Sequence, residues 1–257
     1  MNAPKAHPTR SGALPADSKK ETIMTHSNIL IIATSAKRMS DGEPTGLWLE
    51  ELTTPYYAFR DAGANVTLAS ISGGEVPVDA RSLAEEDDRE TSVQRYMDDT
   101  TAKSAVAETP RFDSLDPSDF DAVFLPGGHG TMFDFPDNPD LARLIETFDR
   151  DGKLIAAVCH GPAALAGPTR PDGAPFVAGR KVAAFTDSEE RAVGLDKAVP
   201  FLLESRLKAL GADHHSAPDF QPFAVQDGNL ITGQNPQSAE KVAQMVLDAL
   251  DRNKQAA

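Results

Sequence analysis

The chain has 257 residues, which suits one domain with extensions and is short for two. Its 25 Lys and Arg against 39 Asp and Glu give a net charge of −14, of which residues 28–257 carry −16. A body this acidic repels phosphate groups, which argues against nucleic acid or an anionic membrane as a partner. The only cysteine, Cys159, excludes an internal disulfide and a cysteine-only metal cage.

Residues 1–27 contain Pro4, Pro8 and Pro15 and no aromatic residue, so they cannot bury enough apolar surface to offset the entropy of ordering. We expect a disordered extension there, and either Met1 or Met24 as the start. No apolar run approaches the roughly 18 residues of a membrane span or forms the core of a signal peptide. These features predict a cytoplasmic protein.

From residue 28 onward, short apolar runs rich in β-branched residues alternate with helical segments. The runs begin at Asn28, Asn65, Asp121, Lys153, Lys181 and Asn229. The helical segments cover about 46–62, 137–151, 199–211 and 236–250. Nearly continuous apolar runs are typical of strands buried on both faces, so residues 28–257 are predicted to form a single α/β domain with a doubly wound, mostly parallel sheet.

Residues 75–119 interrupt this alternation with thirteen acidic and five basic side chains and no strong period. One interpretation is an inserted arm that caps a site or meets a second subunit, which leaves a homodimer open. The other is a solvated acidic loop, and the density of charge favours it.

The candidate catalytic residues follow the end of the run KLIAAV. The next four residues are Cys159, His160, Gly161 and Pro162. A thiol at an abrupt strand-to-helix corner is the layout of a nucleophile elbow, which needs small residues two places before and after the nucleophile. Ala157 and Gly161 occupy those places. A helix N-terminus favours the thiolate, so Cys159 is a candidate nucleophile rather than a small core residue.

A thiolate that attacks a carbonyl needs hydrogen-bond donors for the developing oxyanion. The backbone N–H of His160 is one candidate, and the glycine-rich turn Pro126–Gly130 supplies a second. Both turns follow buried strands, so they are expected on the same rim of the sheet. His129, inside that turn, either lines the site or only decorates the turn.

Helical phase separates two neighbouring glutamates in TGLWLEELTTPYYAF. Trp48, Leu52 and Phe59 form an apolar stripe, to which Glu50 lies almost opposite and Glu51 lies on the flank. Glu50 is therefore expected in solvent. Glu51 points either into solvent or toward a partly apolar rim, where desolvation would favour a protonated carboxyl able to move a proton.

Taken together, the segments TGLWLEELTTPYYAF, DAVFLPGGHGTMFDFP, AAVCHGPAAL, AAFTDSEE and DGNLITGQNP resemble, in sequence and order, the PfpI-like superfamily of class I amidotransferase-like proteins, which are flavodoxin-like in fold. The similarity covers residues 28–250 and is strongest to the heat-shock chaperone branch, whose members are glutathione-independent glyoxalase III enzymes (D-lactate dehydratases).

This resemblance implies a role for each matching residue. It makes Cys159 the nucleophile, His160 the adjacent histidine of a triad, and Glu51 the carboxyl that contacts the thiol. It places the third triad member at Glu190, with Glu189 as the alternative, and the oxyanion hole at the amides of Gly128 and His160.

The remaining histidines argue against related chemistries. No histidine is followed two places later by Glu, so the His-x-Glu pair typical of glutaminases in the wider group is missing. His214 and His215 are adjacent, which suits neither a helical nor a strand metal pair, and a surface loop is expected for both. The prediction is a site without metal or cofactor.

The function that follows is a glyoxalase III that converts methylglyoxal, a small α-oxoaldehyde, to lactate through a hemithioacetal on Cys159. Two alternatives remain open. One is a hydrolase or deglycase that uses the same thiol, and the other is a stress chaperone or oxidation sensor with little turnover.

Overall fold

A computed structural model of the chain describes residues 26–83, 85 and 89–256. The extension predicted over residues 1–27 lies outside this part, except for its last two residues. Ser27 is buried, and its carbonyl accepts a hydrogen bond from the N–H of Asn65 (2.9 Å). The ordered body therefore begins at least two residues before the predicted boundary.

The predicted doubly wound sheet is confirmed. Six strands lie in the order β2-β1-β3-β4-β8-β7, and all neighbours are parallel except β7 and β8. Their bounds are β1 Asn28–Ala33, β2 Asn65–Ser70, β3 Ala122–Leu125, β4 Leu154–Val158, β7 Ala224–Asp227 and β8 Leu230–Gly233. The antiparallel edge strand β7 was not predicted, because its side chains are only half-buried and give no continuous apolar run.

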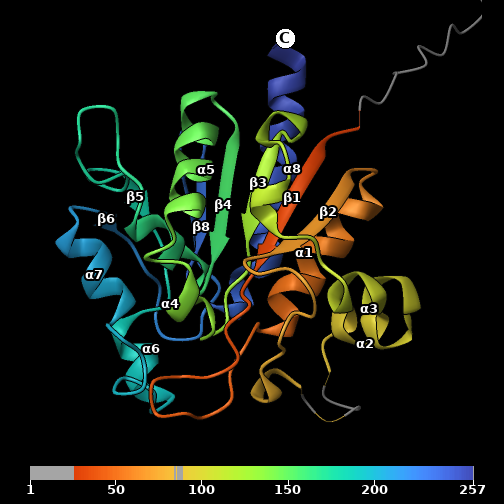
Figure 1. Cartoon of the computed structure of the whole chain (residues 1–257). Helices are drawn as coiled ribbons and strands as arrows, with labels where there is room; N and C mark the ends of the chain where they lie inside the picture. Colours follow the sequence, from red (N-terminus) through yellow and green to blue (C-terminus); the bar gives the residue numbers. More distant parts are fainter. Residues whose placement is uncertain (1–25, 84, 86–88, 257) are drawn as a thin grey trace, which may run out of the picture.

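Helices cover both faces of this sheet, as Figure 1 shows for α5 and α8. The helices are α1 Leu49–Asp61, α4 Thr131–Asp134, α5 Pro139–Arg150, α6 Asp187–Ala192, α7 Leu203–Ala209 and α8 Ala239–Ala256. Alternate strand residues enter different cores: Leu30 and Ile32 pack with α5 and α7, whereas Ile29 and Ile31 pack with α1 and α8. Burial on both faces explains why the strands read as continuous apolar runs.

The run that begins at Lys181 was expected in the main sheet, and this expectation is wrong. Only Lys181–Val182 (β5) is a strand, and it pairs with Asp213–His214 (β6) in a separate two-stranded sheet. Beyond β5, the N–H of Ala183 donates to the side chain of Thr232 in β8 (2.8 Å), so this contact with the main sheet uses a side chain and not a backbone ladder. The β5–β6 pairing also buries the His214 side chain, contrary to the expected surface loop, while His215 is exposed.

The acidic segment 75–119 contains two helices, α2 Thr91–Asp98 and α3 Thr100–Ala107, rather than a solvated loop. Asp99 caps α3 by accepting hydrogen bonds from the N–H groups of Thr101 and Ala102. Val93, Ala102 and Val106 are buried. Three buried apolar side chains among many charged residues do not give a clear helical period. The sequence pattern therefore did not indicate the two helices.

Helix α1 begins three residues later than predicted. Leu47 is extended and exchanges backbone hydrogen bonds with Pro77 and Asp79 (2.7 and 2.9 Å), which prevents residues 46–48 from joining the helix. Across the described residues, no helix combines the length and apolar character needed to cross a membrane.

Candidate active site

Cys159 lies at a sharp corner directly after β4. Its φ of +59° places a non-glycine residue in the left-handed region, which is strained and typical of a nucleophile elbow. Two backbone hydrogen bonds hold the corner: its N–H donates to Gly233 (3.0 Å), and its carbonyl accepts from Phe185 (2.9 Å). Gly161 packs against the Leu125 carbonyl so closely that no Cβ would fit. The predicted elbow is therefore present, but the helix that follows is a short 3₁₀ helix, Gly161–Ala166.

A chain of side chains runs inward from the Cys159 sulfur. His160 Nδ1 is 3.3 Å from Sγ, and His160 Nε2 is 2.7 Å from Oε2 of Glu190. The Glu190 carboxylate only accepts, so Nε2 carries the proton and Nδ1 faces the thiol. Burial alone would raise the pKa of Glu190, but hydrogen bonds from His129 and His160 outweigh it and hold that pKa well below its usual range.

The neighbouring Glu189 points elsewhere and does not contact His160. Its Oε2 accepts from the backbone and hydroxyl of Thr186, which caps α6. Its Oε1 accepts from the N–H of Phe220 (2.8 Å) and from the side chains of Gln234 and Asn235 (3.1 and 2.8 Å). Glu189 therefore ties α6 to the residues that follow β8, and the geometry favours Glu190 as the partner of His160.

Glu51 projects from the first turn of α1 and is completely buried. Its Oε2 accepts a hydrogen bond from the N–H of Gly127 (2.8 Å), while Oε1 is buried without a partner of ordinary geometry. Burial raises the pKa of this carboxyl well above its usual value, although interactions with the Cys159 thiol and Gly127 oppose the rise. The flank position on the helix left two environments open for Glu51, and the buried one, which favours the protonated carboxyl, is found.

Glu50 was expected in solvent, but it is half-buried. Burial, and then the nearby charge of Glu90, raise its pKa to about 7. Helical phase places Glu50 away from the sheet correctly, but the N-terminal end of α2, which begins directly after Glu90, approaches that side of α1. No clear helical period marks α2 in the amino-acid sequence, so this burial could not be predicted.

The Cys159 thiol is buried beside two carboxyl groups. Burial raises the pKa of this thiol, and the carboxyls of Glu51 and Glu189 add to the rise when they are ionised. The segment that follows is a short 3₁₀ helix, and the expectation that a helix N-terminus favours the thiolate stays a prediction. The backbone N–H of His160 acts in the opposite direction through its contact with the sulfur.

The two amides expected to form an oxyanion hole come from the two predicted turns. Gly128 has a φ of +98°, and a Cβ there would collide with the backbone of Gly46 and Trp48. Its N–H donates to no acceptor within the described part of the chain. The N–H of His160 is directed at the Cys159 sulfur. Gly128 and His160 both line the cavity over the sulfur, and the oxyanion hole formed by their amides stays a prediction.

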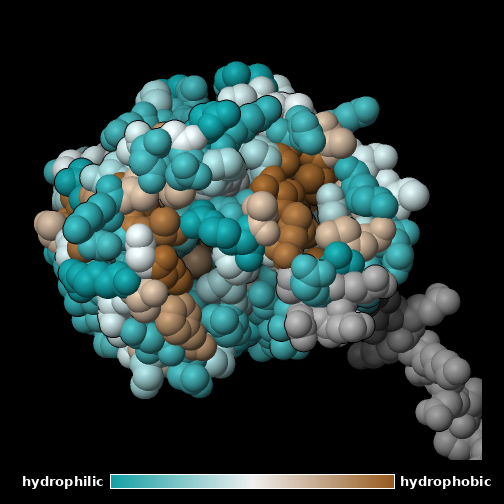
Figure 2. Space-filling model, turned by 90° about the horizontal axis from the view of Figure 1, so that it is seen from below, coloured by the Kyte–Doolittle hydropathy of each residue, from teal (hydrophilic) through white to brown (hydrophobic). Residues whose placement is uncertain are grey.

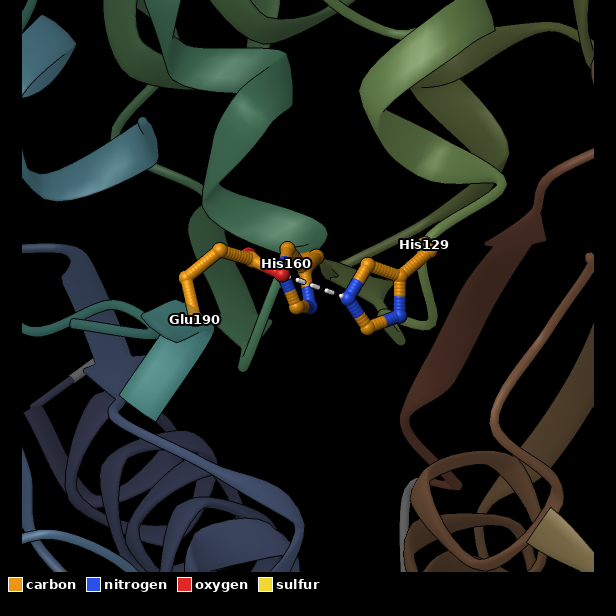
Figure 3. Close-up of side chains that lie close together, drawn as sticks. All are labelled: His129, His160 and Glu190. Carbon is orange, nitrogen blue, oxygen red and sulfur yellow. Dashed lines mark hydrogen bonds and ion pairs between the residues drawn. The ribbon is translucent and has the colours of Figure 1, made fainter. Parts of the chain in front are cut away.

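His129, whose place was left open by the sequence, belongs to the site. It is buried, its ring centroid is 4.2 Å from that of His160, and its Nε2 is 2.8 Å from Oε1 of Glu190. Figure 3 shows the two imidazoles converging on this one carboxylate. Burial and the adjacent His160 lower the pKa of His129 to about 4.

A cavity of about 110 Å³ opens above the sulfur, several times the roughly 10 to 15 Å³ that one water needs. Figure 2 views this end of the molecule and shows hydrophobic residues gathered around a hollow. The residues that line the cavity are Trp48, Gly128, His129, Cys159, His160, Phe185, Val193, Phe220, Pro236 and Gln237. The apolar wall of Phe185, Val193 and Phe220 was not predicted, since these residues are distant in sequence and only the fold brings them together.

Within the described residues, His129, His160 and Glu190 form the one group whose donor atoms could hold a metal ion, with all donors within 4.8 Å of one another. The same atoms already hydrogen-bond to each other at 2.7 and 2.8 Å, so an ion would have to displace both bonds. The expectation of a site without metal stays a prediction.

Comparison with known proteins shows the family of the chain. The sequence model of the DJ-1/PfpI family matches residues 45–249. Glyoxalase 3 of Candida albicans is 33% identical over 227 residues, covering 83% of this chain and 93% of that protein. The glutathione-independent glyoxalase HSP31 of Saccharomyces cerevisiae is 32% identical and covers 88% of this chain and 99% of that protein.

Solved structures with a similar sequence also have a similar fold. The crystal structure of glyoxalase III from Candida albicans superposes with a TM-score of 0.78 at 32% identity, covering 87% of this chain and 97% of that one. The rapid encystment protein of Francisella tularensis superposes with a TM-score of 0.83 at 36% identity, with 87% and 99% covered.

Proposed function

This chain belongs to the DJ-1/PfpI family, and from that premise we propose that it is a glutathione-independent glyoxalase that converts methylglyoxal to lactate. The observation that carries the proposal is the line of contacts from the Cys159 thiol through His160 to Glu190, with the buried Glu51 carboxyl beside the sulfur. The small cavity above the thiol suits a three-carbon aldehyde.

In the first step the thiol adds to the aldehyde carbon. The C–S bond forms as His160 Nδ1 takes the thiol proton, and the electrons of the C=O double bond move to oxygen. The amides of Gly128 and His160 stabilise this oxyanion. The ionised Glu190 supports His160 by stabilising the imidazolium as it forms.

In the second step the hemithioacetal isomerises. Its C1 hydrogen leaves as a proton, an enediol forms, and a proton returns to C2, so C1 is oxidised to a thioester while the neighbouring ketone is reduced to an alcohol. The electrons stay within the substrate, and no external oxidant or reductant is needed. Glu51, held as a neutral acid beside the sulfur, is placed to exchange protons in this step. Water then hydrolyses the thioester, which releases lactate and restores the thiol.

The test is an assay of the purified protein with methylglyoxal and no glutathione, in which lactate is measured. Lactate formed by the wild type and not by Cys159→Ala supports the proposal. Aldehyde loss without lactate indicates adduct formation at thiol, lysine or arginine and contradicts it. Release of free amine from glycated model compounds, without lactate from methylglyoxal, would instead identify a deglycase.

A further inference from the structure

Two residues with a strained backbone line the same cavity. Cys159 and Phe220 both have a φ of +59°, and no other non-glycine residue in the described part of the chain has a positive φ. The strain at Cys159 belongs to the elbow. Phe220 lies in the turn before β7, far from Cys159 in the sequence. Such strain persists only where the surroundings enforce it, and it concentrates at functional sites, so the Phe220 side chain is a candidate for a role in the cavity.

A buried carboxylate holds Phe220 in this conformation. The N–H of Phe220 donates to Oε1 of Glu189 (2.8 Å), and Glu189 is completely buried. The side chain of Asn235 donates to the same oxygen (2.8 Å) and to the carbonyl of Gln221 (2.9 Å), which fixes the next residue of the turn as well. The Phe220 ring is therefore held in place by buried hydrogen bonds, although the residue is 39% exposed.

A row of rings leads from His160 to Phe220. The ring centroid of Phe185 is 4.4 Å from that of His160 and 6.4 Å from that of Phe220. Phe185 is buried, whereas Val193 and Phe220 are exposed large apolar residues. All three line the cavity, so its apolar wall begins beside the reacting groups and ends at the protein surface. A substituent longer than a methyl group can lie along this wall and extend outward.

Charged side chains are missing from the wall. Among the described residues that line the cavity there is no Asp, Glu, Lys or Arg, and the polar side chains are His129, Cys159, His160 and Gln237. A carboxylate or ammonium group on the substrate would lose hydration there without gaining an ion pair. An apolar substituent instead gains free energy from burial against the wall.

We propose that Phe220, with Phe185 and Val193, forms a specificity-determining wall that selects α-oxoaldehydes whose ketone carbon carries an apolar group larger than methyl, such as an aromatic ring. The inference rests on the proposed glyoxalase reaction and names the substrate class of that site. With phenylglyoxal the same isomerisation oxidises C1 to the thioester and reduces C2 to the alcohol, and water then releases mandelate. The ring takes no part in these bond changes, so the wall contributes binding energy rather than chemistry.

The first test compares two aldehydes on the wild type and on two variants of Phe220. Phe220→Asn removes the apolar ring and suits the left-handed backbone, whereas Phe220→Tyr keeps the ring. We expect kcat/KM for phenylglyoxal, measured as mandelate formed, to exceed that for methylglyoxal about 10-fold in the wild type. Phe220→Asn should lower the phenylglyoxal value about 10-fold, mainly through KM, and the methylglyoxal value less than about twofold. Phe220→Tyr should keep both values within about twofold of the wild type.

Two further variants separate the wall from general damage. Leu83→Ser is the matched control, because Leu83 is also an exposed large apolar residue but does not line the cavity, and it should leave the preference unchanged. Val193→Ser changes the wall from the C-terminal end of α6 and should lower the phenylglyoxal value about threefold, which tests the wall even if Phe220→Asn does not fold. A wild type without preference for phenylglyoxal, or equal losses for both aldehydes in the wall variants, would overturn the proposal.

The second test needs no turnover. Phenacyl chloride and chloroacetone both alkylate a thiol, as sulfur displaces chloride from the carbon beside the ketone, and they differ only in a phenyl or methyl group. The ratio of their alkylation rates at Cys159, followed by intact mass, is divided by the same ratio for N-acetylcysteine, which removes their intrinsic difference in reactivity. We expect about 10 for the wild type and a value near 1 for Phe220→Asn.

The two proposals therefore fail separately. A wild type that makes neither lactate nor mandelate contradicts the glyoxalase proposal, and the alkylation ratio still decides the role of the wall. A wild-type ratio equal to that of N-acetylcysteine contradicts the wall, even where lactate formation supports the glyoxalase.

Discussion

The two ends of the sheet carry cavities of opposite character. At the carboxyl ends of the strands, a cavity of about 110 Å³ lies over a strained cysteine and two buried histidines. At the other end, between α1 and α8, a larger cavity of about 430 Å³ is lined by side chains such as His26, Gln244 and Asp251, which are exposed. The comparison shows that buried, hydrogen-bonded polar groups distinguish the end of the sheet that can carry out chemistry, whereas cavity volume does not.

The largest effect should come from removing the thiol. Cys159→Ala is expected to lower kcat/KM for methylglyoxal by about 10³-fold or more, because no covalent intermediate can form. The fold should survive, since alanine is a small residue in a small-residue elbow, and circular dichroism checks this. Retention of more than about a tenth of the activity would remove the covalent role.

Glu190→Gln should come next and differ from Glu189→Gln. An amide at Glu190 presents an N–H to one histidine and reverses its preferred tautomer, so kcat should fall between about 10² and 10³-fold with the fold intact. Glu189→Gln instead sets an amide N–H against donors from Thr186, Phe220, Gln234 and Asn235, and should lower the free energy of unfolding by about 2 kcal/mol. If both variants lost the same amount of kcat and had the same free energy of unfolding, the assignment of Glu190 to catalysis and Glu189 to stability would be contradicted.

Glu51→Gln keeps the shape of the side chain and removes the exchangeable carboxyl proton. We expect kcat to fall about 10²-fold if this group moves protons during isomerisation. Glu50→Gln is the neighbouring control and should change kcat little, because Glu50 does not line the cavity. A loss of activity in Glu50→Gln and not in Glu51→Gln would show that the proton transfer has been assigned to the wrong residue.

A change at Glu50 is expected to affect stability rather than activity. Its pKa is about 7 in the folded chain against 4.5 ordinarily, so folding disfavours its ionised form. Stability is therefore greatest at low pH with respect to this group and declines as pH rises from about 4.5 through 7. Glu50→Gln should remove this decline and gain about 1 kcal/mol above pH 7, a figure reduced for partial solvent screening. Urea unfolding at pH 5 and pH 8 measures it, and parallel curves for variant and wild type would refute it.

The smallest effect is expected at the far cavity. Gln244 is exposed on α8, so Gln244→Trp can fill part of that cavity without touching the core. Activity should stay within about twofold and the free energy of unfolding within about 0.5 kcal/mol of the wild type. A substantial loss of activity would show that the two ends of the sheet are coupled.

The sequence alone was sufficient for the parallel sheet, the elbow at Cys159 and the flank position of Glu51, because each depends on a local pattern: continuous apolar runs, small residues around a corner, and helical phase. Glu190 and Glu189 could not be separated in this way, because they are adjacent on a six-residue helix and only the fold shows which one meets His160. The same holds for His129.

Tertiary structure also decided every question of burial. The sparse apolar contacts of α2 and α3 are hidden among acidic residues, so neither helix was foreseen, and with them the half-burial of Glu50 was missed. The raised pKa of the Cys159 thiol depends on desolvation by residues from several elements. Local sequence fixes backbone preference and helical phase, whereas desolvation depends on which distant segments close over a group, and that is set only when the chain is folded.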